Sequence, residues 1–196
     1  MSTKEEILSR YRNNMKVEGQ YDMPDLDALK GVEYPDVLAQ FVSMSKTVGG
    51  KVVELKEGDD VNEVIKNLYP EAKVFASNLP EINFAQRNPD TVAEAQDLNG
   101  TDVGIVRGEI GVAENGCIWI PQTMKERAVC FISEYLVILL SRKNVVSNMH
   151  QAYSRIKFTD YGYGSFISGP SKTADIAQAL VMGAQAARGV TVILTD

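Results

Sequence analysis

Two glutamates lie in a glycine-rich stretch near the middle of the chain, TDVGIVRGEIGVAENGCIWIP (101–121). Apolar runs on either side of Glu109 and Glu114 predict buried strands joined by a tight turn. Gly116, after Asn115, can take the positive φ of a turn and let the backbone approach a ligand closely. We therefore expect Glu114 to lie in a cleft, as a group for acid–base or nucleophilic chemistry. A hairpin turn whose acid faces water is the alternative.

A second group of chemically useful residues is the heptad GPSKTAD at 169–175, which follows a glycine-broken apolar run. Backbone N–H groups, the hydroxyls of Ser171 and Thr173, and the ammonium of Lys172 could together bind an anion. The segment lacks the leading glycine spacing of a Walker A motif. In the alternative, the hydroxyls cap a helical turn and the lysine is solvated. The candidate ligand-binding residues are Asn115, Gly116, Gly169, Ser171, Lys172, Thr173 and Asp175.

The two segments can act on one ligand only if the fold brings them into a shared hollow. In that arrangement Lys172 pairs with an anion by charge-assisted hydrogen bonds, and the candidate catalytic residues Glu114 and Glu109 lie opposite. One carboxylate buried beside the other would have a raised pKa and could shuttle protons. The sequence therefore predicts an acid from one segment beside the lysine of the other.

The elements that must position these residues follow from periodicity and capping. Asp59 and Asp60 precede a segment with an apolar stripe, and the pair Gly49-Gly50 ends the helical run before it. We expect helices at 3–15, 34–50, 61–68 and from 144 or 147 to 156, and strands at 51–55, 73–77, 103–106, 117–120, 135–140 and 190–194. The early alternation of helix and strand predicts right-handed crossovers and a parallel sheet covered on both faces.

Two stretches remain less defined. The polar connection 78–100 is long for a compact domain and is expected to be functional, a lid, or surface decoration. Residues 176–188 are open between helix and extended structure, whereas 161–168 indicates glycine-broken backbone entering a strand.

Bulk properties limit the classes of function. The chain has 196 residues, 44% hydrophobic and 23% charged, which suits an N-terminal helix and arm (1–33) followed by one α/β domain (34–196). A net charge of −6 without a Lys/Arg run argues against nucleic acid as a partner. No apolar stretch has the length of a membrane span, so we expect a cytoplasmic protein. The arm makes a homodimer plausible.

Metal chemistry has few candidate ligands in this sequence. Cys117 and Cys130 lie in apolar runs without CxxC spacing, and His150 is the only histidine. We therefore expect no metal ion or iron–sulfur cluster on this chain, and leave any other cofactor unassigned. We expect His150 to lie on the surface, since it falls in a polar helical stretch.

The combination of GVAENG, GPSKTADI and a closing VTVIL strand resembles the LUD domain, the family of lactate utilisation protein C (LutC/YkgG), over roughly residues 35–196. Glu114 matches the turn glutamate of that family, and Glu109 stands where it typically has aspartate. Residues 171–175 match its GPSRTADIE-type segment. The chain departs from the family pattern at Asn115, usually threonine, and at Gln185, usually histidine.

This resemblance implies a three-layer α/β/α fold around a mainly parallel sheet, like that of the NagB/RpiA/CoA-transferase group. It implies a component of L-lactate oxidation to pyruvate that acts with iron–sulfur and cysteine-rich partner proteins and binds a small carboxylate or a phosphorylated ligand. The alternatives are a non-catalytic assembly subunit of such a complex and a CoA transferase-like enzyme that uses Glu114 as its nucleophile.

Overall fold

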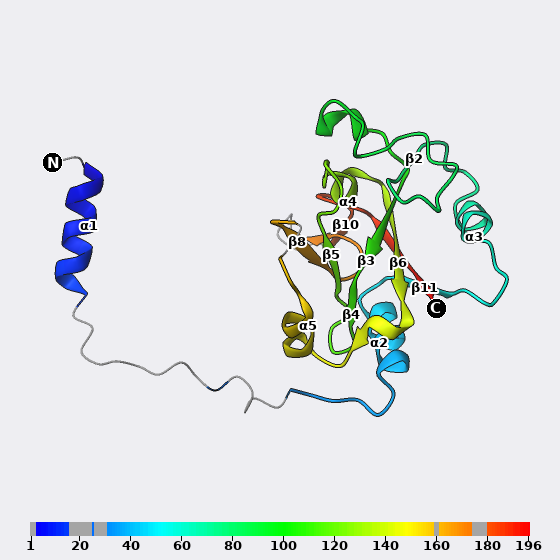
Figure 1. The fold of residues 1–196 in the computed structure, drawn as a ribbon. Coiled ribbons are helices and arrows are strands. Elements are labelled where there is room, and N and C mark those ends of the chain that lie inside the picture. The colour runs from blue at the N-terminus through cyan, green and yellow to red at the C-terminus, as the bar shows by residue number, and fades with distance from the viewer. Residues whose placement is uncertain (1–2, 16–24, 26–30, 159–160, 174–179) are drawn as a thin grey trace. The chain divides into compact units, whose positions relative to one another are not determined.

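The structure is a computed structural model that describes residues 3–15, 25, 31–158, 161–173 and 180–196. The chain divides into two units, Met1–Lys30 and Gly31–Asp196 (Figure 1). The predicted domain boundary after residue 33 stays a prediction, and most of the predicted arm lies outside the described residues.

The first unit contains one helix, α1 (Thr3–Asn14), in its described part, close to the predicted range. Glu5 and Glu6 lie in its first turn and Arg12 in its last. These charges interact favourably with the helix dipole and stabilise the helix. Arg10 pairs with Glu6 one turn away at 3.0 Å. No α1 side chain is buried.

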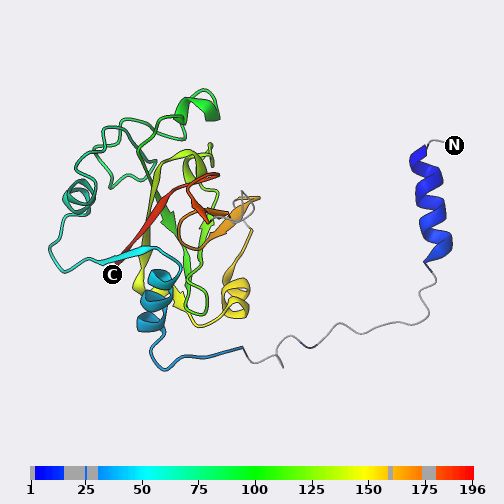
Figure 2. The same ribbon diagram turned by 180° about the vertical axis from the view of Figure 1, so that it is seen from behind.

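The second unit is built on a five-stranded sheet of order β1-β11-β6-β3-β2, in which every neighbouring pair is parallel. The C-terminal strand therefore lies inside the sheet, between β1 and β6 (Figures 1 and 2). The strands of this sheet are β1 (Lys51–Glu54), β2 (Phe75–Ala76), β3 (Val103–Gly108), β6 (Tyr135–Ser141) and β11 (Gly189–Thr195). The predicted mainly parallel sheet is confirmed, although β2 is shorter than expected.

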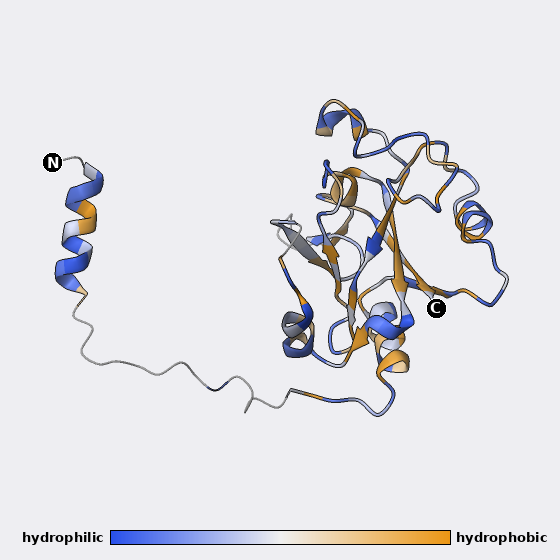
Figure 3. Cartoon of the chain, in the orientation of Figure 1, coloured by the Kyte–Doolittle hydropathy of each residue, from blue (hydrophilic) through white to orange (hydrophobic). Residues whose placement is uncertain are grey.

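Alternating side chains place a different layer on each face of this sheet. Val137 and Leu139 of β6 pack with Ile65 of helix α3 (Val61–Leu68) on one face. Leu136 and Ile138 point to the other face, toward helices α2 (Val37–Thr47) and α4 (Val129–Ile132). Figure 3 shows the resulting apolar strands between more polar outer segments. The predicted α/β class, with helices flanking a mainly parallel sheet, is confirmed.

Aspartate caps fix the beginnings of two of these helices. The side chain of Asp36 accepts a hydrogen bond from the N–H of Ala39 at 2.9 Å, so α2 begins at Val37 rather than at the predicted Tyr34. Asp60 accepts from the N–H of Asn62 at 2.8 Å and begins α3 at the predicted residue.

A second, four-stranded sheet has the order β7-β4-β5-β8. The chain leaves β3 at Gly108 and enters this sheet at Ile110, so the predicted direct turn between strands 103–106 and 117–120 is wrong. The extra strand β4 intervenes and pairs antiparallel with β5. The strands are β4 (Ile110–Val112), β5 (Ile118–Pro121), β7 (Val145–Val146) and β8 (Gly164–Ile167).

The two faces of the second sheet are also covered. Ile118 and Ile120 of β5 belong to the core beneath the large sheet, whereas Trp119 packs toward helix α5 (Met149–Arg155). Helix α5 begins later than predicted, because Asn148 caps it and the preceding residues form β7. The remaining described elements are η2 (Ala95–Leu98), η3 (Arg142–Asn144), β9 (Lys172–Thr173) and β10 (Val181–Met182). None of the helices described is long and apolar enough to cross a bilayer.

Gly108 lies where the two sheets meet, and the space there has room only for a hydrogen. A Cβ at this position would lie 2.4 Å from the Cγ2 of Ile118 and 3.0 Å from that of Ile138. We expect Gly108→Ala to lower the free energy of unfolding by about 1–3 kcal/mol through overpacking, measured by urea denaturation. Gly162→Ala is the control, since no atom lies within 4 Å of its added Cβ. Equal stability of both variants would contradict this packing.

Asp102 joins the entrance of β3 to the segment before β2. Its Oδ2 accepts from the N–H groups of Val74 at 2.8 Å and Lys73 at 2.7 Å, and these bonds lower the carboxyl pKa below its usual 3.8. The stabilisation is present above the unfolded-state pKa and is lost as pH falls through the folded-state pKa. We expect Asp102→Asn to be less stable at pH 7 and to lose less stability on acidification, followed by urea denaturation. If Asp102→Asn loses as much stability on acidification as the unchanged protein does, this role of Asp102 is excluded.

Candidate functional site

The first predicted segment forms the turn between β4 and β5. Gly116 has φ +67°, the left-handed conformation expected of it, and its N–H donates to the carbonyl of Val112 at 2.9 Å. Asn115 Oδ1 accepts from the N–H of Cys117 at 3.0 Å, and the N–H of Glu114 donates to the carbonyl of Ser147 at 3.0 Å. The turn is therefore fixed by its own backbone and by the loop after β7.

The second predicted segment runs from the end of β8 into β9. Gly169 has φ +62°, and a Cβ there would lie 2.5 Å from the carbonyl oxygen of Val48. Lys172 Nζ donates to that same carbonyl and lies 3.5 Å from the carbonyl of Pro170. Lys172 and Thr173 form strand β9. The residues that would follow in a helical turn capped by Thr173 lie outside the described residues, so that alternative stays a prediction. Asp175 lies outside the described residues.

The structure brings the two segments into contact at the end of α2. The Oγ of Ser168 donates to the carbonyl of Asn115 at 2.8 Å. A Cβ on Gly116 would lie 3.2 Å from the Cα of Ser45 in the last turns of α2, the same helix end that Gly169 approaches. The backbones of both segments are thus held against one helix terminus.

The two candidate acids are not placed side by side. Glu109 precedes β4 and donates its N–H to the carbonyl of Trp119 at 2.8 Å, whereas Glu114 lies in the turn beyond the other end of β4. At about 3.3 Å per residue of strand, their α-carbons are separated by more than about 10 Å. Both side chains are half-buried.

A hollow of about 370 Å³ lies beside the second segment, between it, α4 and the residues that lead into β11. Its lining includes the predicted Gly169, Ser171 and Lys172, and does not include Glu109, Glu114, Asn115, Gly116 or Thr173. The full lining is Cys130, Phe131, Leu136, Phe166, Ile167, Ser168, Gly169, Pro170, Ser171, Lys172, Gln185, Ala186, Ala187 and Val190.

Two further hollows adjoin the first, of about 580 Å³ and 340 Å³. Phe131 and Gln185 line all three, so the three spaces meet at these side chains. The largest is lined by Ala95, Gln122, Lys125, Glu126, Arg127, Ala128, Phe131, Ile132 and Gln185. The sequence did not predict this wall of the hollows, because α4 has only four residues and therefore shows no clear period.

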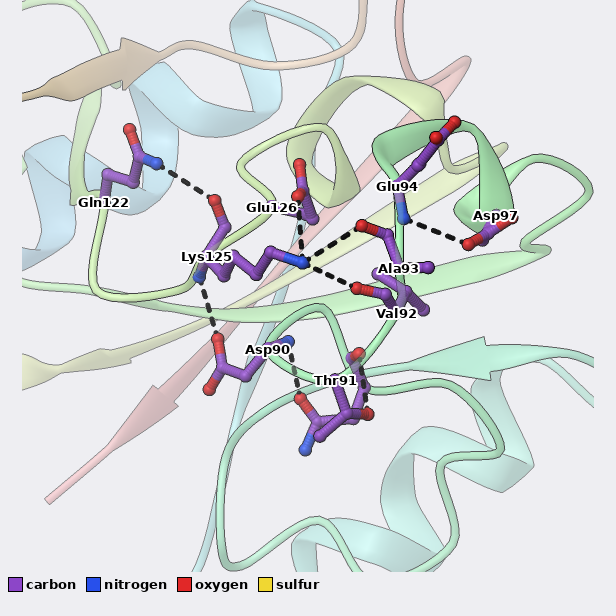
Figure 4. A network of polar contacts seen from close by, with 10 residues as sticks. Asp90, Thr91, Val92, Ala93, Glu94, Asp97, Gln122, Lys125 and Glu126 are labelled. Carbon is purple, nitrogen blue, oxygen red and sulfur yellow. Dashed lines mark hydrogen bonds and ion pairs between the residues drawn. The ribbon is translucent and has the colours of Figure 1, made fainter.

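Lys125 ties the long connection 78–100 to this region (Figure 4). Its Nζ donates to the carbonyls of Val92 at 2.8 Å and Ala93 at 3.1 Å, and its N–H donates to Asp90 Oδ1 at 2.9 Å. The connection thereby places Ala95 at the wall of the largest hollow. Its functional or lid-like role stays a prediction.

The two thiols are held in their neutral form by burial. Desolvation raises the pKa of Cys130 to about 12 and also raises the pKa of the half-buried Cys117. His150 is exposed, as expected. Within the described ranges, no group of three or more His, Cys, Asp or Glu side chains is placed to hold a metal ion.

The fold and the site define an α/β protein whose glycine–hydroxyl–lysine segment lines a hollow at the rim of a parallel sheet. The family model of the LUD domain matches residues 87–195, more than half of the chain, and the chain belongs to the LUD domain family. A crystal structure of a DUF162 family protein from Deinococcus radiodurans shares this fold, with a TM-score of 0.60 and 12% identity over 82% of this chain and 96% of that one.

The chain is also similar to lactate utilization protein C of Shouchella clausii (strain KSM-K16). The two are 30% identical over 116 residues, which cover 56% of this chain and 50% of that protein. The match thus spans about half the length of the curated relative.

The bond between Ser168 and Asn115 links the two segments next to the pairing of β5 with β8. We expect Ser168→Ala to lower the free energy of unfolding by about 1 kcal/mol, because the carbonyl of Asn115 loses its donor. Urea denaturation provides the measurement. Ser154→Ala is the control, since the Ser154 hydroxyl is exposed and bonds only within α5, to the carbonyl of Gln151. A loss no greater than that of the control would show that this bond does not hold the segments together.

Proposed function

We propose that this chain is a lactate-utilisation component that binds a small anionic ligand in the hollow lined by residues 168–172 and Gln185. The observation that carries the proposal is the lining itself, which combines Lys172 and Ser171 with apolar residues such as Leu136 and Val190. A mostly apolar concavity with a few converging polar groups is the usual form of a small-molecule site. The relative named lactate utilization protein C supports the choice of pathway.

Lys172 is suited to this role by its position and its remaining hydrogen-bonding capacity. Its ammonium has three N–H donors, of which the carbonyls of Val48 and Pro170 take two, the second at 3.5 Å. The third donor and the positive charge are available to a carboxylate or phosphate oxygen. The apolar side chains of Leu136 and Val190 in the lining exclude water and strengthen such a bond.

In this proposal the two glutamates do not contact the anion in the hollow. Glu114 supports the site through its turn, whose Asn115 carbonyl accepts from Ser168. This arrangement gives no support to a CoA transferase-like reaction with Glu114 as nucleophile, since the carboxylate of a nucleophile must border the space that holds the substrate.

We propose that the redox step takes place with partner proteins. Oxidation of a hydroxy acid requires an electron acceptor, and the two cysteines of this chain are held as thiols by burial. Iron–sulfur and cysteine-rich lactate utilisation proteins are the partners we propose, with this chain presenting or sensing the carboxylate.

Titration calorimetry with L-lactate and pyruvate tests the proposed site. We expect Lys172→Ala to weaken binding at least about tenfold, because a charge-assisted hydrogen bond is lost. Lys143→Ala, at an exposed lysine of η3, should bind as the unchanged protein does. Glu114→Gln should also leave binding unchanged.

Because Lys172 also bonds to Val48, thermal unfolding of each variant must accompany the titrations. Undiminished binding by a folded Lys172→Ala variant would overturn the proposed site. Loss of binding by a folded Glu114→Gln variant would show that Glu114 is part of the binding site.

A further inference from the structure

We propose that the natural ligand of this site is an elongated molecule with an anionic group at each end. One end binds at Lys172 and Ser171 in the first hollow, and the other binds at Arg127 in the adjoining hollow of about 580 Å³. The middle of the ligand lies along Phe131. This inference rests on the proposed function, and it concerns the size and charge of the ligand rather than the existence of the first site.

The two hollows are neighbours. Phe131 and Gln185 line both of them, so a molecule that fills one meets side chains that border the other. Phe131 is 38% exposed although it is aromatic and belongs to a helix whose two preceding residues are buried. An aromatic ring left exposed between two concave surfaces offers an apolar contact for the middle of a ligand.

The combined space of the two hollows exceeds what a three-carbon acid needs. The first hollow alone, at about 370 Å³, falls within the usual range of about 300–1,000 Å³ for sites that hold drug-sized molecules. The adjoining hollow is larger still. A lactate ion held by Lys172 would leave the second hollow to solvent.

Arg127 is the cation proposed for the far end of the ligand. Lys125 and Arg127 both line the second hollow, but their charges are used differently. The ammonium of Lys125 donates to the carbonyls of Val92 and Ala93 and lies 3.6 Å from Glu126 (Figure 4). Lys125 is therefore occupied with holding the 92–93 backbone in place.

Arg127, by contrast, keeps most of its donors. Its guanidinium lies over the ring of Tyr163, with its carbon 4.3 Å from the ring centroid, and its one hydrogen bond among the described residues is a long contact of 3.5 Å to Gln122. No carboxylate of the described chain forms an ion pair with it. Stacking fixes the plane of the guanidinium, and a planar fork with open donors matches a carboxylate or phosphate.

Titration calorimetry with straight-chain dicarboxylates, from glutarate to sebacate, and with monocarboxylates of equal length tests the inference. We expect one chain length at which the second carboxylate tightens binding by about tenfold or more. Arg127→Gln should remove this gain and leave the monocarboxylate affinity unchanged. Arg127→Lys, which keeps the charge without the fork, should retain part of it. Lys172→Gln should weaken both series, and Lys143→Gln neither.

The outcomes separate this inference from the function on which it rests. Monocarboxylates that bind through Lys172, with no gain at any length of the dicarboxylates, would overturn the two-ended ligand and leave the first site standing. If a folded Arg127→Gln variant still binds the dicarboxylate more tightly than the monocarboxylate, the two-ended ligand is equally overturned. If no carboxylate binds, both proposals are wrong.

Discussion

The carbonyl groups at the C-terminal end of α2 lack partners within the helix, and they carry the negative end of its dipole. The backbones of Gly49 and Gly50 return to satisfy the carbonyls of Lys46 and Ser45, at 2.9 Å each. The carbonyl of Val48 instead receives the ammonium of Lys172, from a segment more than a hundred residues later in the sequence. The turn at Gly116 and the segment from Gly169 to Lys172 both pack against this helix terminus.

The same constraint explains why glycine stands at two positions of these motifs. Gly116 and Gly169 both have positive φ, and an added Cβ on either would press on α2, at 3.2 Å from Ser45 Cα and 2.5 Å from Val48 O. The glycines therefore serve close approach and turn geometry together. Lys172 bonds to the end of this helix and also lines the first hollow.

Capping residues and the spacing of apolar residues predicted the helices and strands that depend mainly on short-range interactions. The cap at Asp60 gave α3 its start, and the apolar runs of β6 and β11 gave buried parallel strands. The passage at Glu109 from one sheet to another was not predictable, since the alternation of a strand does not specify which sheet it joins. Of the predicted ligand-binding residues, Gly169, Ser171 and Lys172 line the first hollow. Its opposite wall, from α4 and Gln185, depends on tertiary packing of segments that have no distinctive period of their own.

The energetics of the first hollow argue for a ligand that reaches beyond it. A monocarboxylate held there gains a charge-assisted hydrogen bond from Lys172, worth about 1.5–3 kcal/mol, and about 1 kcal/mol from a hydroxyl such as Ser171. Together these approach only the 4.1 kcal/mol that corresponds to a dissociation constant of about 1 mM. The lysine cannot give more, because its remaining donors are committed to Val48 and Pro170. Tighter binding therefore has to come from apolar contact along Phe131 and from a second charged group, and both are available in the adjoining hollow.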